Sequence, residues 1–152
     1  WLMDDMVAAV PRRGTGRRAL ALGRSDIAGK TGTTNASRDT WFNGFNRNLV
    51  ASVWVGFDQL QSLGDREEGG TTAVPIWVNY MREALRAVPE QVRPRPAGLV
   101  TERVSATTGL IAAAGDPDGI EETFLAEHLP QPGTASDQPQ DSTTGNNSDP
   151  LF

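Results

Sequence analysis

One lysine stands in this chain, Lys30, within the run IAGKTGTTN at residues 27–35, whereas the other thirteen basic residues are all arginine. Arginine carries a planar guanidinium that is always charged, while lysine carries a compact ammonium on a flexible stem and shifts its pKa readily. In a composition so biased toward arginine, an ammonium kept at one position indicates chemistry that a guanidinium does not perform. A lysine left by chance is the alternative, and the neighbours of Lys30 decide between the two.

Two kinds of loop place glycine, lysine and threonine together. The first is the phosphate-binding loop G-x-x-x-x-G-K-[ST], which cradles phosphates at the N-terminus of a helix. Here five residues rather than four separate Gly23 from Gly29. The residues after Thr31 are Gly, Thr, Thr and Asn, which make a poor start for a helix. Spacing and context therefore both argue against a nucleotide site.

The second is the Lys-Thr-Gly element of serine acyltransferases that act on peptidoglycan peptides and β-lactams. In that element a lysine attracts an anionic substrate and supports proton movement, and a hydroxyl beside it bonds the substrate carboxylate. A glycine lets the substrate backbone come close, since a Cβ would block it, and the next residue offers its backbone N–H to the developing oxyanion. The groups needed occur here in that order, as Lys30, Thr31, Gly32 and Thr33.

The charge of the chain divides into two parts. Residues 1–100 carry thirteen basic and ten acidic groups, a net +3, and residues 101–152 carry one basic and nine acidic groups, a net −8. No basic cluster is interleaved with aromatic residues, which argues against nucleic acid as a partner. The sequence has no cysteine for disulfides or thiolate metal sites. No apolar run approaches the ~20 residues of a membrane span.

Four acidic residues around a Gly-Asp-Pro-Asp-Gly run invite a calcium interpretation, namely Asp116, Asp118, Glu121 and Glu122. Their spacing does not match an EF-hand loop, and Asp-Pro-Asp-Gly is favourable turn chemistry by itself. We therefore expect a turn here, and neither a metal nor another cofactor. His128 is the only histidine in the chain and is expected on the surface.

Hydrophobic patterning predicts the elements that position Lys30. In chain order they are a helix over 1–10 that ends at Pro11, strands over 26–33, 39–45 and 48–58, a helix from about residue 73, and short strands over 98–104 and 109–114. Residues 46–48 are expected to join two strands as a hairpin. In the second helix, Trp77, Met81, Leu85 and Val88 form one apolar stripe, which predicts packing against a sheet.

The two ends of the chain carry their own expectations. Residue 1 opens an uncapped helical pattern without an initiator methionine, and we interpret it as a cut inside a longer polypeptide. Residues 131–152 contain only Ala135, Leu151 and Phe152 as apolar residues. Such a segment cannot bury enough surface to offset its ordering entropy, so it is expected to be disordered.

The run GTGRRALALGRSDIAGKTGTTNASRDTWFNGF, residues 14–45, resembles the C-terminal transpeptidase region of class A penicillin-binding proteins, the bifunctional enzymes of bacterial cell-wall synthesis. VASVWVGFD and GGTTAVPIWVNYM continue the likeness in the same order, and TTGLIA and EETF extend it more weakly. The resemblance divides the chain into the C-terminal part of a transpeptidase domain at 1–90, a small β-rich extension at 91–130 and a polar, disordered tail at 131–152.

This resemblance implies an α/β (α+β) fold of the β-lactamase/transpeptidase type, with an antiparallel sheet and a helix from about Ala73 packed against it. Lys30 would lie on a strand that lines the active site, with the next two strands at about Thr40–Phe45 and Leu49–Phe57. Trp41 and Phe42 follow the motif closely, and they would belong either to the sheet core or to the lining of the cleft.

The resemblance also implies roles for the four motif residues. Lys30 would be catalytic, and the hydroxyls of Thr31 and Thr33 would hold the substrate carboxylate. Gly32 would admit the substrate backbone, and the N–H of Thr33 would form half of an oxyanion hole.

For the whole protein, the resemblance implies a serine-type D-Ala-D-Ala transpeptidase that cross-links peptidoglycan stem peptides through a serine acyl-enzyme and binds β-lactams. The parent would also carry a glycosyltransferase domain. It would work at the periplasmic face of the bacterial inner membrane, with its anchor upstream of this chain.

The chain departs from the family pattern in one large respect. No serine is followed by lysine three residues later, since Ile27 occupies that place before Lys30, and no convincing Ser-x-Asn element is present. The chain would therefore supply one wall of an active site, depend on upstream polypeptide for the nucleophile and be inactive alone. A fragment of a serine β-lactamase-like hydrolase and a non-catalytic β-rich binding module remain as alternatives.

Overall fold

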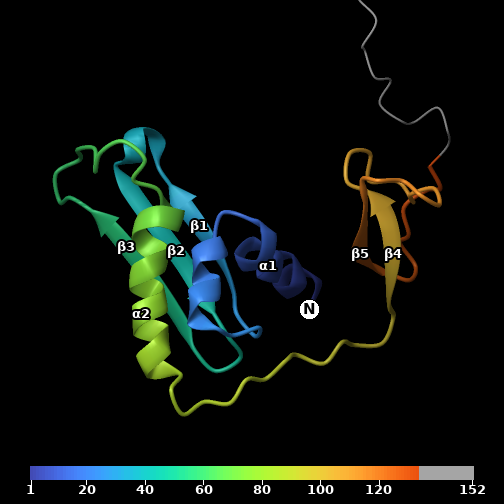
Figure 1. Cartoon of the computed structure of the whole chain (residues 1–152), viewed down its shortest axis with the longest axis horizontal. Coiled ribbons are helices and arrows are strands. Elements are labelled where there is room, and N and C mark those ends of the chain that lie inside the picture. The colour runs from blue at the N-terminus through green and yellow to red at the C-terminus, as the bar shows by residue number, and fades with distance from the viewer. Residues whose placement is uncertain (134–152) are drawn as a thin grey trace, which may run out of the picture. The chain divides into compact units, whose positions relative to one another are not determined.

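The computed structural model describes residues 1–133 of the chain. They fall into two compact units, Trp1–Pro96 and the part that begins at Ala97. The first unit holds a three-stranded sheet and the helices, and the second holds a two-stranded sheet (Figure 1). Helices combined with antiparallel strands confirm the predicted α/β (α+β) class. The disorder predicted for the polar tail lies, from residue 134 onward, outside the described residues.

The sheet of the first unit is antiparallel in the order β1 (Ala28–Thr33), β2 (Asp39–Phe45) and β3 (Val50–Gly56). The predicted hairpin between β2 and β3 is confirmed, and Asn46 closes it. Its side-chain Oδ1 accepts the N–H groups of Asn48 and Leu49 at 3.0 and 2.9 Å. An asparagine that bonds the backbone two and three residues ahead mimics a turn, which explains why the reversal occurs here.

Helix α2 (Val74–Ala84) covers one face of this sheet, as Figure 1 shows. Of its predicted apolar stripe, Trp77 and Met81 are fully enclosed, while the buried Leu85 and the partly buried Val88 lie beyond the end of the helix. The Trp77 ring meets Phe42 of β2 edge-on at 5.1 Å between centroids. The Trp77 Nε1–H lies between two sheet carbonyls, of Gly44 at 3.3 Å and Ala51 at 3.1 Å. The helix is therefore fixed to the sheet by both packing and a polar contact.

Helix α1 (Leu2–Arg13) runs past Pro11, so the predicted end of the first helix at Pro11 is wrong. Proline lacks an N–H and crowds the preceding turn, which usually ends a helix. Here the Pro11 side chain is fully buried, and the last turn closes with the Gly14 N–H donating to the Val10 carbonyl at 3.0 Å. Burial of the proline ring offsets the one hydrogen bond that the backbone loses.

The second unit pairs β4 (Leu99–Ser105) with β5 (Gly119–Leu125), antiparallel and in register over their whole length. The first strand and the turn at Asp116–Gly119 are confirmed, since the Gly119 N–H donates to the Asp116 carbonyl. The second strand predicted at 109–114 is wrong. That segment touches β4 only through an isolated bridge at Ile111, and the strand that pairs with β4 along its whole length is β5.

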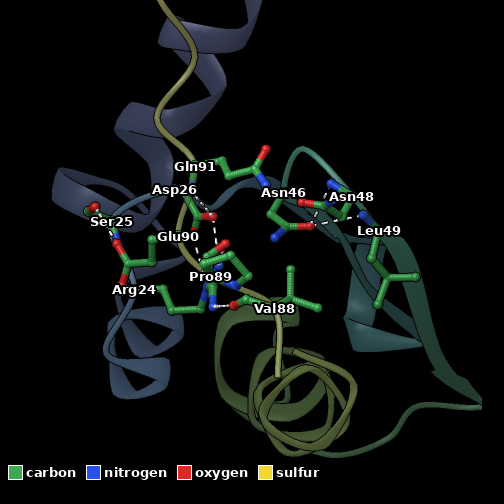
Figure 2. Close-up of polar contacts among 10 residues, drawn as sticks. All are labelled: Arg24, Ser25, Asp26, Asn46, Asn48, Leu49, Val88, Pro89, Glu90 and Gln91. Atoms are coloured by element: carbon green, nitrogen blue, oxygen red, sulfur yellow. Dashed lines mark hydrogen bonds and ion pairs between the residues drawn. The ribbon is translucent and has the colours of Figure 1, made fainter. Parts of the chain in front are cut away.

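An ion pair at the entry to β1 ties the chain that leaves α2 to the sheet (Figure 2). Arg24 donates to both carboxylate oxygens of Asp26 at 2.8 and 2.7 Å, and also to the Val88 carbonyl at 2.8 Å. The Gln91 N–H donates to Asp26 at 3.2 Å, and the Ser25 hydroxyl donates to Glu90 at 2.7 Å. Residues 88–91 are thereby held against residues 24–26, just before β1.

The environment of Asp26 sets the direction of its pKa. Burial of the carboxyl, whose side chain is 1% exposed, would raise that pKa. The hydrogen bonds from Arg24 and from the Gln91 N–H, together with the positive charge of Arg24, outweigh burial and lower it. A lowered folded pKa means that the carboxylate stabilises the fold above the unfolded pKa, and that this contribution is lost as pH falls through the folded value.

We expect Asp26→Asn to destabilise the chain by about 3 kcal/mol at pH 7, because it leaves the buried Arg24 guanidinium without its anion. The difference in stability from wild type should begin to shrink below about pH 4, where Asp26 of the unfolded chain takes up a proton, and should vanish as pH falls through the lowered pKa of the folded carboxyl. Urea unfolding at a series of pH values measures both effects, with the exposed Asp58→Asn as the control. A deficit that stays constant from pH 7 down to pH 2 would contradict this account.

Candidate active-site edge

Lys30 to Thr33 lie on β1, which is an edge strand. In the part of the chain that the structure describes, β1 pairs with β2 alone. The Thr34 N–H donates to the Asp39 carbonyl at 3.0 Å, and this bond fixes the phase of the ladder. Because antiparallel pairs alternate between hydrogen-bonded and non-bonded positions, Gly32 and Lys30 bond β2. The N–H and C=O groups of Thr31 and Thr33 therefore point to the open edge.

The Lys30 ammonium is drawn to the same edge. Its Nζ donates to the Thr31 carbonyl at 2.9 Å, and that carbonyl is one of the groups directed away from β2. The Lys30 residue is exposed, so the ammonium keeps donors for a further partner. The Thr33 N–H lies two residues farther along the strand, a separation of about 6.8 Å between Cα atoms.

The hydroxyls of Thr31 and Thr33 lie on the face of the sheet that β2 shares through Phe42, the face covered by α2. Each hydroxyl has a partner from another segment. Thr31 Oγ1 lies 2.5 Å from the Oγ1 of Thr15, and Thr33 Oγ1 accepts the Gly69 N–H at 3.0 Å. The hydroxyls of both threonines are therefore bonded to segments that lie far from them in the sequence.

Gly32 lies on the opposite face, beside Trp41 of β2. A Cβ at Gly32 would stand 3.3 Å from the Cβ of Trp41. Trp41 is 39% exposed, whereas Phe42 is fully buried in the core. Phe42 therefore belongs to the sheet core, as one of the two interpretations predicted, while Trp41 points to the opposite face because adjacent residues of a strand alternate in direction.

Two glycines, Gly69 and Gly70, pack against the backbone beside the edge strand at the start of the short π-helix Gly69–Ala73. A Cβ on Gly69 would meet the carbonyl oxygens of Trp41 and Gly32 at 2.4 and 2.7 Å, and one on Gly70 would meet the Thr15 carbonyl at 2.5 Å. Only residues without a side chain permit this approach. Sequence reasoning missed the roles of Gly69, Gly70 and Thr15, and the only signal was the glycines of GTG and GGTT.

Taken together, the open edge presents an ammonium and an outward backbone N–H, with two hydroxyls on one adjoining face. This set suits an anionic ligand that carries a polarised carbonyl. Within residues 1–133, no group of three His, Cys, Asp or Glu side chains could hold a metal ion. The same residues include no helix that is long and apolar enough to cross a membrane. His128 is exposed as predicted.

Comparison with known proteins shows which proteins the chain resembles. Over 130 residues the chain is 52% identical to penicillin-binding protein 1A of Pseudomonas aeruginosa, a match that covers 86% of this chain and 16% of that protein. Over 128 residues it is 46% identical to penicillin-binding protein 1A of Neisseria cinerea, covering 79% of this chain and 16% of the relative. The chain is penicillin-binding protein 1A-like. No protein-family model matches it.

Comparison with solved structures also points to penicillin-binding protein 1A. The crystal structure of penicillin-binding protein 1A from Haemophilus influenzae matches with a TM-score of 0.75 and 37% sequence identity, over 86% of this chain and 20% of that one. The predicted resemblance to penicillin-binding proteins is therefore confirmed. The chain spans about one sixth of the length of the penicillin-binding protein 1A relatives that it matches.

We expect Gly69→Ala to lower stability by roughly 1–3 kcal/mol, the usual cost of forcing extra atoms into a packed site. Its Cβ would fall on two backbone oxygens that cannot rotate away. Gly32→Ala is the matched control, since its Cβ meets only the Trp41 side chain at 3.3 Å and should cost less. Thermal unfolding of the two variants measures the difference, and equal losses would show that Gly69 does not support β1 by close approach.

Proposed function

We propose that this chain forms the Lys-Thr-Gly-Thr wall of the active site of a peptidoglycan D,D-transpeptidase. The observation that carries the proposal is the phase of β1, which directs the Thr33 N–H to the open edge where the Lys30 ammonium also lies. A substrate laid along this edge would run antiparallel to β1 and approach most closely at Gly32.

Each group then has a task in acyl transfer. The Thr31 and Thr33 hydroxyls hold the carboxylate of a stem peptide ending in D-Ala-D-Ala, or that of a β-lactam. The Thr33 N–H donates to the oxygen of the reacting carbonyl as negative charge develops there, half of an oxyanion hole. Lys30 stabilises the anionic substrate and assists proton movement at the leaving group.

The nucleophile must come from another part of the polypeptide, because this chain has no Ser-x-x-Lys element. In the proposal that part also supplies the general base and the second oxyanion donor. The whole protein cross-links stem peptides through a serine acyl-enzyme, carries a glycosyltransferase domain as well, and works at the periplasmic face of the inner membrane. The penicillin binding named for the relatives supports this assignment.

We expect Lys30→Arg in the full-length protein to slow β-lactam acylation nearly as much as Lys30→Ala. A guanidinium keeps the charge but is wider and does not readily give up a proton. Loss of one well-placed contact to a reacting centre costs about a hundred- to a thousandfold in rate. The measurement is the second-order acylation rate constant for a fluorescent penicillin, with folding checked by thermal melts.

The isolated chain is the negative control in this assay and should remain unlabelled. If Lys30→Arg keeps more than about a third of the wild-type rate, charge alone accounts for Lys30. Stable labelling of the isolated chain would overturn the proposal that the nucleophile lies elsewhere. Rapid loss of label from the full-length protein would instead favour a β-lactamase-like hydrolase.

A further inference from the structure

The hydroxyl of Thr15 lies 2.5 Å from the hydroxyl of Thr31, although sixteen residues separate them. Thr15 is outside the Lys-Thr-Gly-Thr run and belongs to the turn Gly14–Gly16 between α1 and the 3₁₀ helix Arg17–Leu22. Nothing in the local pattern of this turn marks Thr15 as a site residue. Its contact with Thr31 arises only because the turn folds against β1.

The turn that carries Thr15 is closely packed on two sides. On one side, a Cβ at Gly16 would stand 3.2 Å from Val10 and 3.4 Å from the Phe42 ring. On the other, Gly70 lies so close to the Thr15 carbonyl that a Cβ there would be 2.5 Å away. The backbone at Thr15 is therefore confined between the core and the glycine pair. This confined backbone places the exposed Thr15 side chain beside Thr31, where the two hydroxyls meet.

The single hydrogen on each hydroxyl determines how this contact can affect ligand binding. A threonine hydroxyl has one hydrogen to donate and lone pairs that accept. If Thr15 donates to Thr31 Oγ1, the single hydrogen of Thr31 is left for a ligand acceptor. Thr33 is arranged in the same sense, because its Oγ1 already accepts the Gly69 N–H and so retains its own hydrogen. Both hydroxyls are then donors toward the ligand, which matches a carboxylate.

We propose that Thr15 is a positioning residue for this site: it donates to Thr31 Oγ1 and thereby turns the Thr31 hydrogen toward the substrate carboxylate. The inference rests on the proposed function. Thr15 does not touch the reacting atoms, and it acts through Thr31 alone. A donor chain of this kind also polarises each hydroxyl in turn, which strengthens the bond to the ligand.

The experiment uses the full-length protein with Thr15→Val, Thr15→Ser, Thr31→Val and the double variant Thr15→Val/Thr31→Val. The readout is the second-order rate constant for acylation by a fluorescent penicillin, with thermal melts alongside. Thr15→Val keeps the shape but removes the donor, and should slow acylation about three- to tenfold, the value of one hydrogen bond. Thr15→Ser restores the hydroxyl and should remain within about twofold of wild type. The exposed Thr107→Val is the matched control.

The double variant separates action through Thr31 from a general structural role. It should be no slower than Thr31→Val alone, because without the Thr31 hydroxyl Thr15 has nothing to orient. Multiplying effects in the double variant, or a Thr15→Val rate equal to wild type while Thr31→Val is impaired, would overturn the inference and leave the proposed function standing. If Thr31→Val itself acylates at the wild-type rate, the proposed role of Thr31 fails first. If Thr15→Val and Thr15→Ser lower the melting temperature equally and slow acylation equally, Thr15 has only a structural role. That result would also overturn the inference.

Discussion

The alternation of hydrogen bonding along an antiparallel edge strand is the constraint on which the site depends. A residue of β1 can bond its backbone to β2 or present it to the open edge, but not both. The bond from Thr34 to Asp39 sets that choice for every residue before it. A shift of one residue would turn the Thr33 N–H into the sheet and carry the two hydroxyls to the other face. The chemistry of the run is therefore a matter of register as much as of residue type.

Register is secured from several directions. Core packing of Trp77 against Phe42 fixes the face of β2, and the Asn46 turn fixes its pairing with β3. The ion pair of Arg24 with Asp26 holds the segment entering β1. Gly69 also lies close to the backbone of Gly32, and its N–H donates to Thr33 Oγ1. Each contact is far from the others in sequence, so the strand is positioned by the assembled unit.

Sequence reasoning reached the elements whose signals are local. The Lys-Thr-Gly-Thr run, the β2–β3 hairpin and the apolar stripe of α2 follow from residue type and spacing, and so does the resemblance to penicillin-binding proteins. Features that depend on contacts between residues far apart in the sequence were not predicted. Pro11 stays within α1, where its ring is fully buried, and β4 takes its full ladder from β5, which lies farther along the chain than the predicted strand at 109–114. The support given by Thr15 and Gly69 was hidden for the same reason, since a glycine's neighbours cannot be read from its place in the chain.

The most direct test of the account is a crystal structure of the full-length protein acylated by a β-lactam. The account predicts that the acyl carbonyl oxygen lies about 2.7–3.1 Å from the Thr33 nitrogen, the range of an oxyanion-hole donor. It also predicts that the ligand carboxylate accepts hydrogen bonds from Thr31 and Thr33, with the ligand running along the open edge of β1. A ligand bound elsewhere, or a Thr33 N–H paired with another strand of the protein, would contradict the central claim that this edge is the substrate-binding wall.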